Sequence, residues 1–358
     1  MIGKKIVILA ISGILIFTCL ISGSEASKYI SKEALWKNKK EVKLEHVFTI
    51  GSDDFEEDEK YFFALINDIE FDGHGNLYVL DVKAWRINKY TPEGVFIQSF
   101  TLNKGRGPGD HVRPMKIAID KEGDIFIADM YKRVTILDKE GKLKNTLSIK
   151  EKGFLAYIAV GFDKNIYLTR FHNSHTDQIF EYDSMTGTLI KTFCKYNHGE
   201  TLQDMLSGDI TTDYEGNLYY TALYPYEIKK FSKEGKLLNF FSREANFQEP
   251  IKSTIASSGI DLLSISMGIA VFPDGKTMNL IRKETVLSKT KRKTEYWFDV
   301  YSKDGKWLIS FSSDRLKNDF VRLFNIDPFG YLYLDYFNPY PHIKKYKIEF
   351  VDKKAESK

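Results

Sequence analysis

The chain has 358 residues, and its 52 Lys and Arg residues nearly balance its 49 Asp and Glu residues, giving a net charge of +3. A hydrophobic fraction of 43% excludes an intrinsically disordered chain, and the near-neutral charge gives no bulk attraction toward nucleic acid, so no nucleic-acid partner is expected. Two cysteines cannot form a disulfide framework, so the fold must depend on its hydrophobic core.

The N-terminal stretch has the layout of a secretory signal peptide. Lys4 and Lys5 precede an apolar run from residue 6 to 21, and small residues occupy the positions that a cut after Ala26 requires. The alternatives are an uncleaved anchor and lipidation at Cys19, whose context loosely resembles a bacterial lipoprotein box. The chain is therefore expected to be exported, as a periplasmic protein, an outer-envelope lipoprotein or an extracellular protein. A membrane contact is expected only through the uncleaved signal or a lipidated Cys19.

After this stretch, the chain repeats one unit about every 51 residues. Each copy has an apolar strand, a tight turn rich in Gly, Asp, Asn and Lys, and a second strand of the Leu-Tyr-Val type. A variable loop, a third strand, a turn of the Lys-Glu-Gly type and a fourth strand follow, most clearly in 115–147. The first turn is marked in six copies: Gly75-Asn76-Leu77-Tyr78, Gly123-Asp124-Ile125-Phe126, Lys164-Asn165-Ile166-Tyr167, Gly216-Asn217-Leu218-Tyr219, Gly275-Lys276-Thr277-Met278 and Gly330-Tyr331-Leu332-Tyr333.

Four-stranded antiparallel units of this length are typical of β-propeller blades, which bury both sheet faces against their neighbours. The six copies therefore predict an all-β fold, a six-bladed β-propeller. The last copy ends after Phe350 without a fourth strand, whereas a strand-like stretch at 41–50 precedes the first copy. We expect that N-terminal strand to complete the last blade and close the ring, because closure removes exposed sheet edges.

These patterns divide the chain into a signal peptide at 1–26, a leader at 27–40, the propeller at 41–350 and a disordered tail at 351–358. Length alone would suggest two or three domains, but the period makes the repeats one ring. Removing the signal leaves Cys194, which we interpret as a packing residue at the end of a strand.

In two copies the second strand ends in an Asp, at Asp81 and Asp129, and the third strand opens with an Arg, at Arg86 and Arg133. By this pattern the two copies resemble NHL repeats, and the whole chain resembles the bacterial secreted six-bladed β-propeller proteins. The segment 104–110 resembles the Gly-Pro-Gly segment after the first blade of the bacterial group. The resemblance implies an architecture and not an activity, because propellers host many functions. Copies three to five depart from the pattern, with Thr169, Thr221 and Arg282 where the Asp is expected.

The long, variable segments of the repeats point to one face, here called the loop face, and the tight turns point to the other, here called the turn face. The loop face is the candidate binding face for a protein, peptide or glycan ligand. Its candidate residues are aromatic, basic or imidazole side chains, which suit carboxylates, phosphates or sugars: Trp85, Arg106, His111, Arg113, Tyr131, Arg170, His172, His175, Tyr224, Tyr340 and His342. The alternative is structural, with Arg86 and Arg133 pairing with Asp81 and Asp129 to tie adjacent loops.

The sequence is compatible with two functions. A secreted or envelope-anchored binding scaffold without a cofactor is favoured, and no catalytic residue is recognisable. The alternative is a metal-dependent lyase or hydrolase that acts at the central mouth with calcium or zinc. The peptide-amidating lyases, six-bladed propellers with a His-bound metal, show that the fold allows this chemistry, but neither an HxH nor an HExxH spacing is present.

Two further segments carry a hypothesis. The basic run 289–293 lies in the lengthened loop of the fifth copy and is interpreted as a solvated hairpin tip. Its alternative is a contact with an anionic polymer or with lipid headgroups. The long connection 242–266 is expected to hold a short helix that caps the mouth.

Overall fold

The computed structural model describes most of the chain after residue 26. The signal peptide and Cys19 lie outside the described residues, and no described helix is long and apolar enough to cross a membrane. The described residues are 27–31, 33–54, 58–171, 177–195, 207–243, 251–252, 260–261, 264–288, 291–312, 321 and 323–353.

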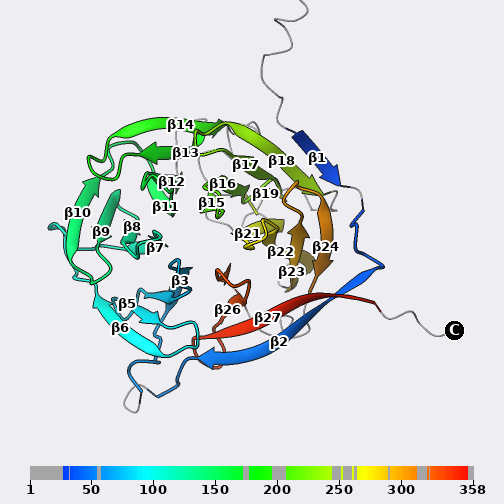
Figure 1. Ribbon diagram of the computed structural model, residues 1–358, viewed down its shortest axis with the longest axis horizontal. Coiled ribbons are helices and arrows are strands. Elements are labelled where there is room, and N and C mark those ends of the chain that lie inside the picture. Colours follow the sequence, from blue (N-terminus) through cyan, green and yellow to red (C-terminus); the bar gives the residue numbers. More distant parts are fainter. Residues whose placement is uncertain are drawn as a thin grey trace, which may run out of the picture.

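Six four-stranded antiparallel sheets stand around a central axis, as Figure 1 shows. In blades one to five the strands follow chain order from the axis to the rim, so each blade is a meander. Blade one comprises β3 (Ile66–Phe71), β4 (Leu77–Asp81), β5 (Arg86–Tyr90) and β6 (Phe96–Thr101). Blade two comprises β7 (Pro114–Ile119), β8 (Ile125–Asp129), β9 (Arg133–Leu137) and β10 (Leu143–Ser148). Blade three comprises β11 (Phe154–Val160), β12 (Ile166–Phe171), β13 (Asp177–Tyr182) and β14 (Leu189–Lys195).

The second half of the ring continues this order. Blade four comprises β15 (Gly208–Thr212), β16 (Leu218–Ala222), β17 (Ile228–Phe231) and β18 (Leu237–Arg243). Blade five comprises β21 (Ser264–Val271), β22 (Thr277–Ser288), β23 (Lys291–Tyr301) and β24 (Trp307–Phe311). Blade six comprises β25 (Phe324–Ile326), β26 (Leu332–Tyr336), β27 (His342–Asp352) and, from the other end of the chain, β2 (Lys40–Ile50). The all-β, six-bladed prediction is confirmed.

The ring is closed by pairing between the two ends of the chain. Strand β2 runs antiparallel to β27 from Lys40 opposite Asp352 to Ile50 opposite Ile343. This is the strand that 41–50 was expected to supply, so the closure prediction is confirmed. Strand β27 also continues to Asp352, into residues expected to belong to a tail.

The stretch expected to be a leader forms a strap along the rim of the disc, drawn in blue in Figure 1. Strand β1 (Ser27–Ser31) pairs in parallel with the outer strand β18 of blade four. The Leu35 and Trp36 amides then donate to the Trp307 and Leu308 carbonyls of blade five, at 3.1 and 2.8 Å. The chain next enters β2 in blade six, so one continuous segment joins the outer edges of three blades. The sequence did not predict this strap.

The recurring first turn has a physical explanation. In blade one, Asp72 Oδ1 accepts hydrogen bonds from the backbone amides of His74 and Asn76, both at 3.0 Å, which fixes the hairpin. Lys89 lies 3.2 Å from Asp72 Oδ2 and 4.8 Å from the centre of the Tyr78 ring, so it neutralises the buried carboxylate. The same Asp, Lys and Tyr arrangement recurs in blades four and six: Asp213, Lys230 and Tyr219, and Asp327, Lys345 and Tyr333.

Apolar side chains from neighbouring blades interdigitate between the sheets. In the largest cluster, Met278 and Phe298 of blade five pack with Leu332 and Leu334 of blade six. The second strands of blades one, two, four and six (β4, β8, β16 and β26) are buried at every residue, and Tyr and Phe fill many of these positions. Cys194 lies buried between blades three and four, where burial raises the pKa of its thiol to about 12, so it is protonated at neutral pH.

The connection after blade four differs from its prediction where it is described. Strands β19 (Ile251–Lys252) and β20 (Ile260–Asp261) pair antiparallel, and no helix is seen at these residues. The rest of the segment between Arg243 and Ser264 lies outside the described residues.

We expect Trp36→Ala to loosen the strap. The Trp36 ring packs against Phe350 at 5.4 Å between centroids and against the core between blades five and six. Losing this half-buried ring should lower the free energy of unfolding by about 2–3 kcal/mol, measured by urea denaturation. Leu35→Ala, at an exposed neighbour, should change it by less than about 0.5 kcal/mol. Equal losses in the two variants would contradict a packing role for Trp36.

Candidate functional site

The innermost strands of all six blades line a narrow cavity on the propeller axis. Its volume is about 40 Å³, enough for one or two waters. Charged and polar side chains meet there, although the strands otherwise carry apolar residues. The polar lining consists of Asp68, Glu70, Lys116, Tyr157, Asp209, Thr211 and Asn325.

Two of the axial carboxylates are held by defined partners on neighbouring blades. Asp68 accepts from Lys116 Nζ at 2.8 Å and from the Ile117 amide at 2.9 Å, which joins blade one to blade two. Asp209 accepts from the Ile210 and Ile269 amides at 2.8 and 3.0 Å, which joins blade four to blade five. These bonds position the inner strands around the axis.

Glu70 differs from its neighbours because no described lysine or arginine forms an ion pair with it. Its Oε2 accepts a hydrogen bond from Asn325 Nδ2 at 3.1 Å, and Asn325 Nδ2 also donates to the Ile69 carbonyl at 3.0 Å. Burial, together with the nearby Asp68 and Asp209 carboxylates, raises the pKa of Glu70 well above its ordinary value. Burial also raises the pKa of Asp209 to about 6, against the lowering effect of Lys116.

The axial cavity adjoins a larger pocket on the turn face. This pocket has a volume of about 250 Å³, and Glu70, Thr211 and Asn325 line both spaces. Every blade contributes to its wall, which mixes apolar groups with carboxylates and hydroxyls. The further lining residues are Phe71, Asp72, Gly73, Ile119, Asp120, Lys121, Phe162, Thr212, Asp213, Tyr214, Val271, Ile326 and Pro328.

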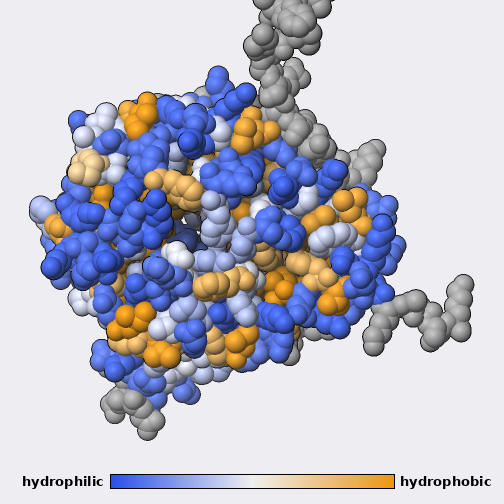
Figure 2. Space-filling view, viewed as in Figure 1, coloured by the Kyte–Doolittle hydropathy of each residue, from blue (hydrophilic) through white to orange (hydrophobic). Residues whose placement is uncertain are grey.

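Aromatic side chains are exposed around this pocket. Phe162 is 52% exposed and Tyr214 is 48% exposed, both in first turns that line it, and Phe329 in the first turn of blade six is 60% exposed. The Phe329 ring also packs against Gly75, where an added Cβ would lie 2.5 Å from that ring. Gly75 therefore both supplies the positive φ of its turn and leaves room for the ring of the neighbouring blade. The disc in Figure 2 is mostly hydrophilic on the face shown and is hollowed near its centre.

The candidate residues of the loop face are spread over the blades. Arg106 and Arg113 are exposed, and Tyr131 is exposed with an edge contact to Phe154. Trp85 is half-buried beneath the Lys104 ammonium, 4.8 Å from its ring centre. Tyr224 and Tyr340 are half-buried, whereas His172 and His175 lie outside the described residues.

Both described candidate histidines are buried in separate blades. His342 stacks on Tyr336 with ring centroids 5.2 Å apart, and its Nδ1 donates to the Tyr340 carbonyl at 2.7 Å. His111 is 1% exposed, and its Nδ1 has no hydrogen-bond partner. Burial lowers the pKa of His111. Among the described residues, no group of three or more His, Cys, Asp or Glu side chains could hold a metal ion.

Arg170 is not available to a ligand at the surface, because its guanidinium is buried inside blade three. It stacks on Phe180 at 3.7 Å and donates to the Lys152 carbonyl at 2.9 Å and to the Tyr182 hydroxyl. By strand register, Arg170 occupies in blade three the position that Asp81 occupies in blade one. It is therefore Arg170, and not Thr169, that replaces the Asp, and in blade five the counterpart is Ile281 and not Arg282.

The Asp and Arg pairs of blades one and two are structural, but their partners differ from those expected. Asp81 accepts from the amides of Ala64, Leu65 and Ala84, and Asp129 likewise from those of Val112, Arg113 and Tyr131. Arg86 donates to the Phe62 carbonyl at 2.8 Å, and Arg133 donates to the Gly107 carbonyl at 2.7 Å. Each Asp and each Arg thus ties the preceding loop through backbone groups, and the expected Arg-to-Asp ion pairs are not what holds these loops.

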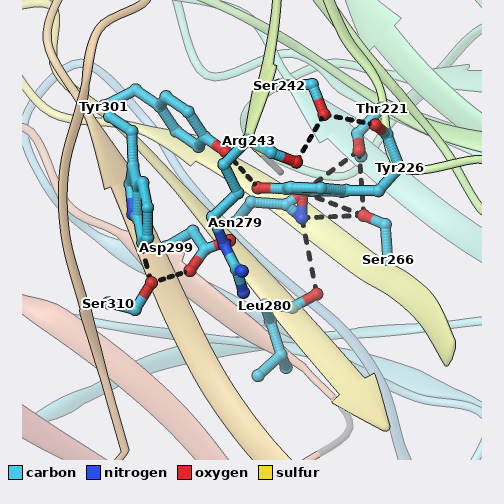
Figure 3. Close-up of polar contacts among 11 residues, drawn as sticks. Thr221, Tyr226, Ser242, Arg243, Ser266, Asn279, Leu280, Asp299, Tyr301 and Ser310 are labelled. Atoms are coloured by element: carbon cyan, nitrogen blue, oxygen red, sulfur yellow. Dashed lines mark hydrogen bonds and ion pairs between the residues drawn. The ribbon is translucent and has the colours of Figure 1, made fainter. Parts of the chain in front are cut away.

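A second polar cluster joins blades four and five (Figure 3). Arg243 Nε donates to Asp299 Oδ2 at 2.5 Å, Ser310 donates to Asp299 Oδ1, and the Tyr226 and Tyr301 hydroxyls lie 2.9 Å apart. Burial raises the pKa of Asp299 while Arg243 opposes the rise, and the pKa values of both tyrosines are raised by burial. Beside them, Thr221 and Ser266 hydroxyls share hydrogen bonds with Asn279 Oδ1. These groups satisfy one another, so the cluster is an inter-blade tie and not an open site.

The axial residues and the turn-face pocket were not predicted from the sequence. A usable signal was present, because Asp68, Lys116 and Asp209 each place a charge inside the first strand of a copy. The first strand of a propeller blade lines the axis, so charge at that position indicates a polar channel.

Comparison with known proteins supports the architecture. No family model and no curated protein matches the sequence. The solved structures that are similar include a member of the DUF4221 family from Bacteroides vulgatus, with a TM-score of 0.66 at 13% identity over 88% of this chain and all of that one. A second, named a putative exported protein from Bacteroides fragilis, has a TM-score of 0.59 at 12% identity over 91% of this chain and all of that one. A streptogramin B lyase has a TM-score of 0.50 at 14% identity over 89% of this chain and all of that one. At these identities, the likeness shows the propeller fold alone.

Glu70→Gln should change how stability depends on pH. A folded-state pKa above the unfolded value means that the folded chain holds the proton longer, so this residue costs stability as pH rises above about 4.3. Gln keeps a carbonyl that can accept from Asn325 and removes the titration. At pH 8 the variant should melt about 2–4 °C above the parent, with the two converging at pH 4, in thermal denaturation. An unchanged pH profile, like that expected of the exposed Glu140→Gln control, would contradict the assignment.

His111→Gln should reduce the loss of stability that occurs when the pH falls, whereas Glu70→Gln should reduce the loss that occurs when the pH rises. Because burial lowers the pKa of His111, the unfolded chain binds a proton first as pH falls below about 6.5, and the folded state loses stability. The parent should therefore lose more stability than the variant between pH 7 and pH 5 in urea denaturation. His46→Gln, at an exposed histidine, should retain the parental loss. A parental loss in His111→Gln as well would show that this imidazole does not govern the acid response.

Proposed function

We propose that this protein is an exported binding scaffold that takes its ligand on the propeller axis, at the turn-face pocket. The observation that carries the proposal is that all six blades contribute to one pocket, in which exposed Phe162 and Tyr214 lie with the Glu70 carboxyl, which forms no ion pair with a described lysine or arginine. Apolar walls with a few convergent polar groups are the usual composition of a ligand site. Export is supported by the layout of residues 1–26 and by the printed name of one structural neighbour.

The chemistry of the pocket favours a ligand that combines an apolar or planar ring surface with hydrogen-bonding groups. The aromatic rings at the rim offer flat surfaces for a sugar ring or an apolar side chain. Glu70 and Asn325 at the floor offer a carboxyl group and an amide to hydroxyl or amine groups. A short peptide or a glycan end satisfies both requirements, and the pocket size suits one or two residues of either.

The loop-face candidates and the lyase alternative remain separate proposals. Arg106, Arg113 and Tyr131 are exposed and form a second surface that a protein partner could contact. The lyase alternative is prompted by the streptogramin B lyase among the structures of similar fold. Elemental analysis of the purified protein tests it, because stoichiometric calcium or zinc would favour metal chemistry at the mouth.

The turn-face proposal predicts which aromatic residues a ligand needs. Ligands would first be sought on an array of oligosaccharides and short peptides, and the best binder measured by calorimetry. The double variant Phe162→Ala and Tyr214→Ala should weaken its binding at least about tenfold, since each ring is a contact surface and not part of the core. Tyr131→Ala, an equally exposed aromatic on the loop face, is the matched control and should bind as the parent does. Loss of binding in the control alone would move the ligand to the loop face.

A further inference from the structure

The axial cavity contains more acidic groups than basic ones. Its described lining holds the carboxylates of Asp68, Glu70 and Asp209 and a single lysine, Lys116. The Lys116 ammonium forms its ion pair with Asp68, at 2.8 Å. Carboxylates that share one cation in a space with little water oppose the ionisation of one another. A positive charge brought to the axis from outside the chain would therefore be bound favourably.

Glu70 is the carboxyl group of this set that a ligand in the turn-face pocket can contact. Its half-buried side chain lines both the axial cavity and the pocket. Its Oε2 accepts a hydrogen bond from Asn325 Nδ2 at 3.1 Å, and no described lysine or arginine forms an ion pair with it. The floor of the pocket thus offers one carboxyl group whose ionised form has a neutral partner and no cation.

The other carboxylates of the pocket wall already have lysine partners. Ammonium groups lie 3.1–3.2 Å from three of them, in the pairs Asp72 with Lys89, Asp120 with Lys164 and Asp213 with Lys230. Lys121, a further charged residue of the wall, lies 3.8 Å from Glu122. Because these charges cancel locally, the unbalanced negative charge of the pocket lies at Glu70.

The wall of the pocket is aromatic and aliphatic. Phe162 and Tyr214 are 52% and 48% exposed, and the face of an aromatic ring attracts an ammonium group. The aliphatic part of the wall consists of Ile119, Val271, Ile326 and Pro328. Such a wall packs well against an apolar side chain, whereas it leaves many hydroxyl groups of a sugar ring without a hydrogen-bond partner.

We infer that the turn-face pocket binds the amino terminus of a peptide whose first side chain is apolar, with the terminal ammonium group paired to Glu70. This assignment rests on the proposed function, which places the ligand in this pocket. The ammonium group supplies the cation that the axis lacks, and the first side chain packs against the aromatic and aliphatic wall. A volume of about 250 Å³ lies below the usual range for a complete small ligand, so the pocket suits the end of a chain.

Calorimetry with two matched peptides tests the inference. The probes are the amide of Leu-Ala-Ala with a free amino terminus and the same peptide acetylated at that terminus, which removes the charge. The parent should bind the free peptide at least about tenfold more tightly than the acetylated one, because a charge-assisted hydrogen bond is lost. Glu70→Gln should weaken binding of the free peptide about tenfold and leave binding of the acetylated peptide unchanged, which separates the charge from the added bulk.

Glu215→Gln is the matched control. Glu215 is exposed in the first turn of blade four, next to Tyr214, and the substitution makes the same change in net charge on the same face. This variant should bind both peptides as the parent does. Thermal denaturation should show both variants folded, because Glu70→Gln is expected to raise the melting temperature. Equal weakening in the two variants would reduce the effect to net charge and overturn the inference.

Binding of the free peptide should also release a proton. Glu70 must ionise to pair with the ammonium group, so the affinity should fall as the pH is lowered from 7 to 5. At pH 6 the heat of binding should depend on the ionisation enthalpy of the buffer, and this dependence should be lost in Glu70→Gln. Proton release that persists in the variant would come from another axial group and overturn the pairing. The neighbouring charged or titratable groups are Asp68, Lys116, Tyr157, Asp209 and Tyr214.

The possible failures of the inference and of the proposed function differ. If the parent binds both peptides equally, or neither, the amino terminus is not the recognised group, and the inference is overturned while the pocket remains a candidate site. If the free peptide binds as well to the double variant Phe162→Ala and Tyr214→Ala as to the parent, the ligand lies elsewhere and the proposed function fails too. A glucosamine oligomer that binds through Glu70 when the peptide does not would overturn the assignment to a peptide.

Discussion

The pairing of β2 with β27 is the constraint on which the rest of the disc depends. A six-bladed ring whose last blade lacks a strand leaves one sheet edge open, and the only described strand that fills this place comes from the other end of the chain. The inner strands can surround an axis only when this pairing holds blade six against blade one. The strap that continues from β2 back to β1 extends the same closure over the rims of blades four and five.

Ring closure also determines which side chains meet on the propeller axis. It brings six inner strands together, and their side chains meet in a space too small for much water. The buried carboxylates of Asp68 and Asp209 are stabilised there by hydrogen bonds from backbone amides and, for Asp68, from Lys116. The same hydrogen bonds tie neighbouring blades together. Glu70 forms no ion pair with a described lysine or arginine, so burial favours its neutral form, and it lines both the axial cavity and the larger turn-face pocket. The pocket is therefore a property of the closed ring and of no single blade.

The sequence predicted those features that depend on local signals. Five of the six first turns carry a glycine such as Gly75 with positive φ, and Lys164 takes that conformation in blade three. In blade one the Asp72 carboxylate also accepts amides within four residues. These local signals let the blade count be derived from the chain alone. The β2 closure followed from the missing fourth strand. The parallel pairing of β1 with β18 joins segments more than 200 residues apart, and no local turn in the sequence indicates it. Arg170 stands six residues after Lys164, as Asp81 stands six residues after Gly75, so the repeat alone could have aligned these two residues. The burial of the Arg170 guanidinium against Phe180 depends on packing within blade three, which periodicity cannot show.

The polar cluster in Figure 3 lies at the base of the ribbon formed by the long strands β22 and β23 of blade five. A blade held only by apolar packing resists sliding against its neighbour weakly, because such contacts are non-directional. Asn279 and Asp299, the residues at the base of β22 and β23, are also the ones bonded to Thr221 and Arg243 of blade four. Directional bonds between buried groups fix that blade against its neighbour at the level where the ribbon begins. Where blades four and five depart from the repeat pattern, these buried polar bonds thus add a directional tie to the apolar packing between the blades.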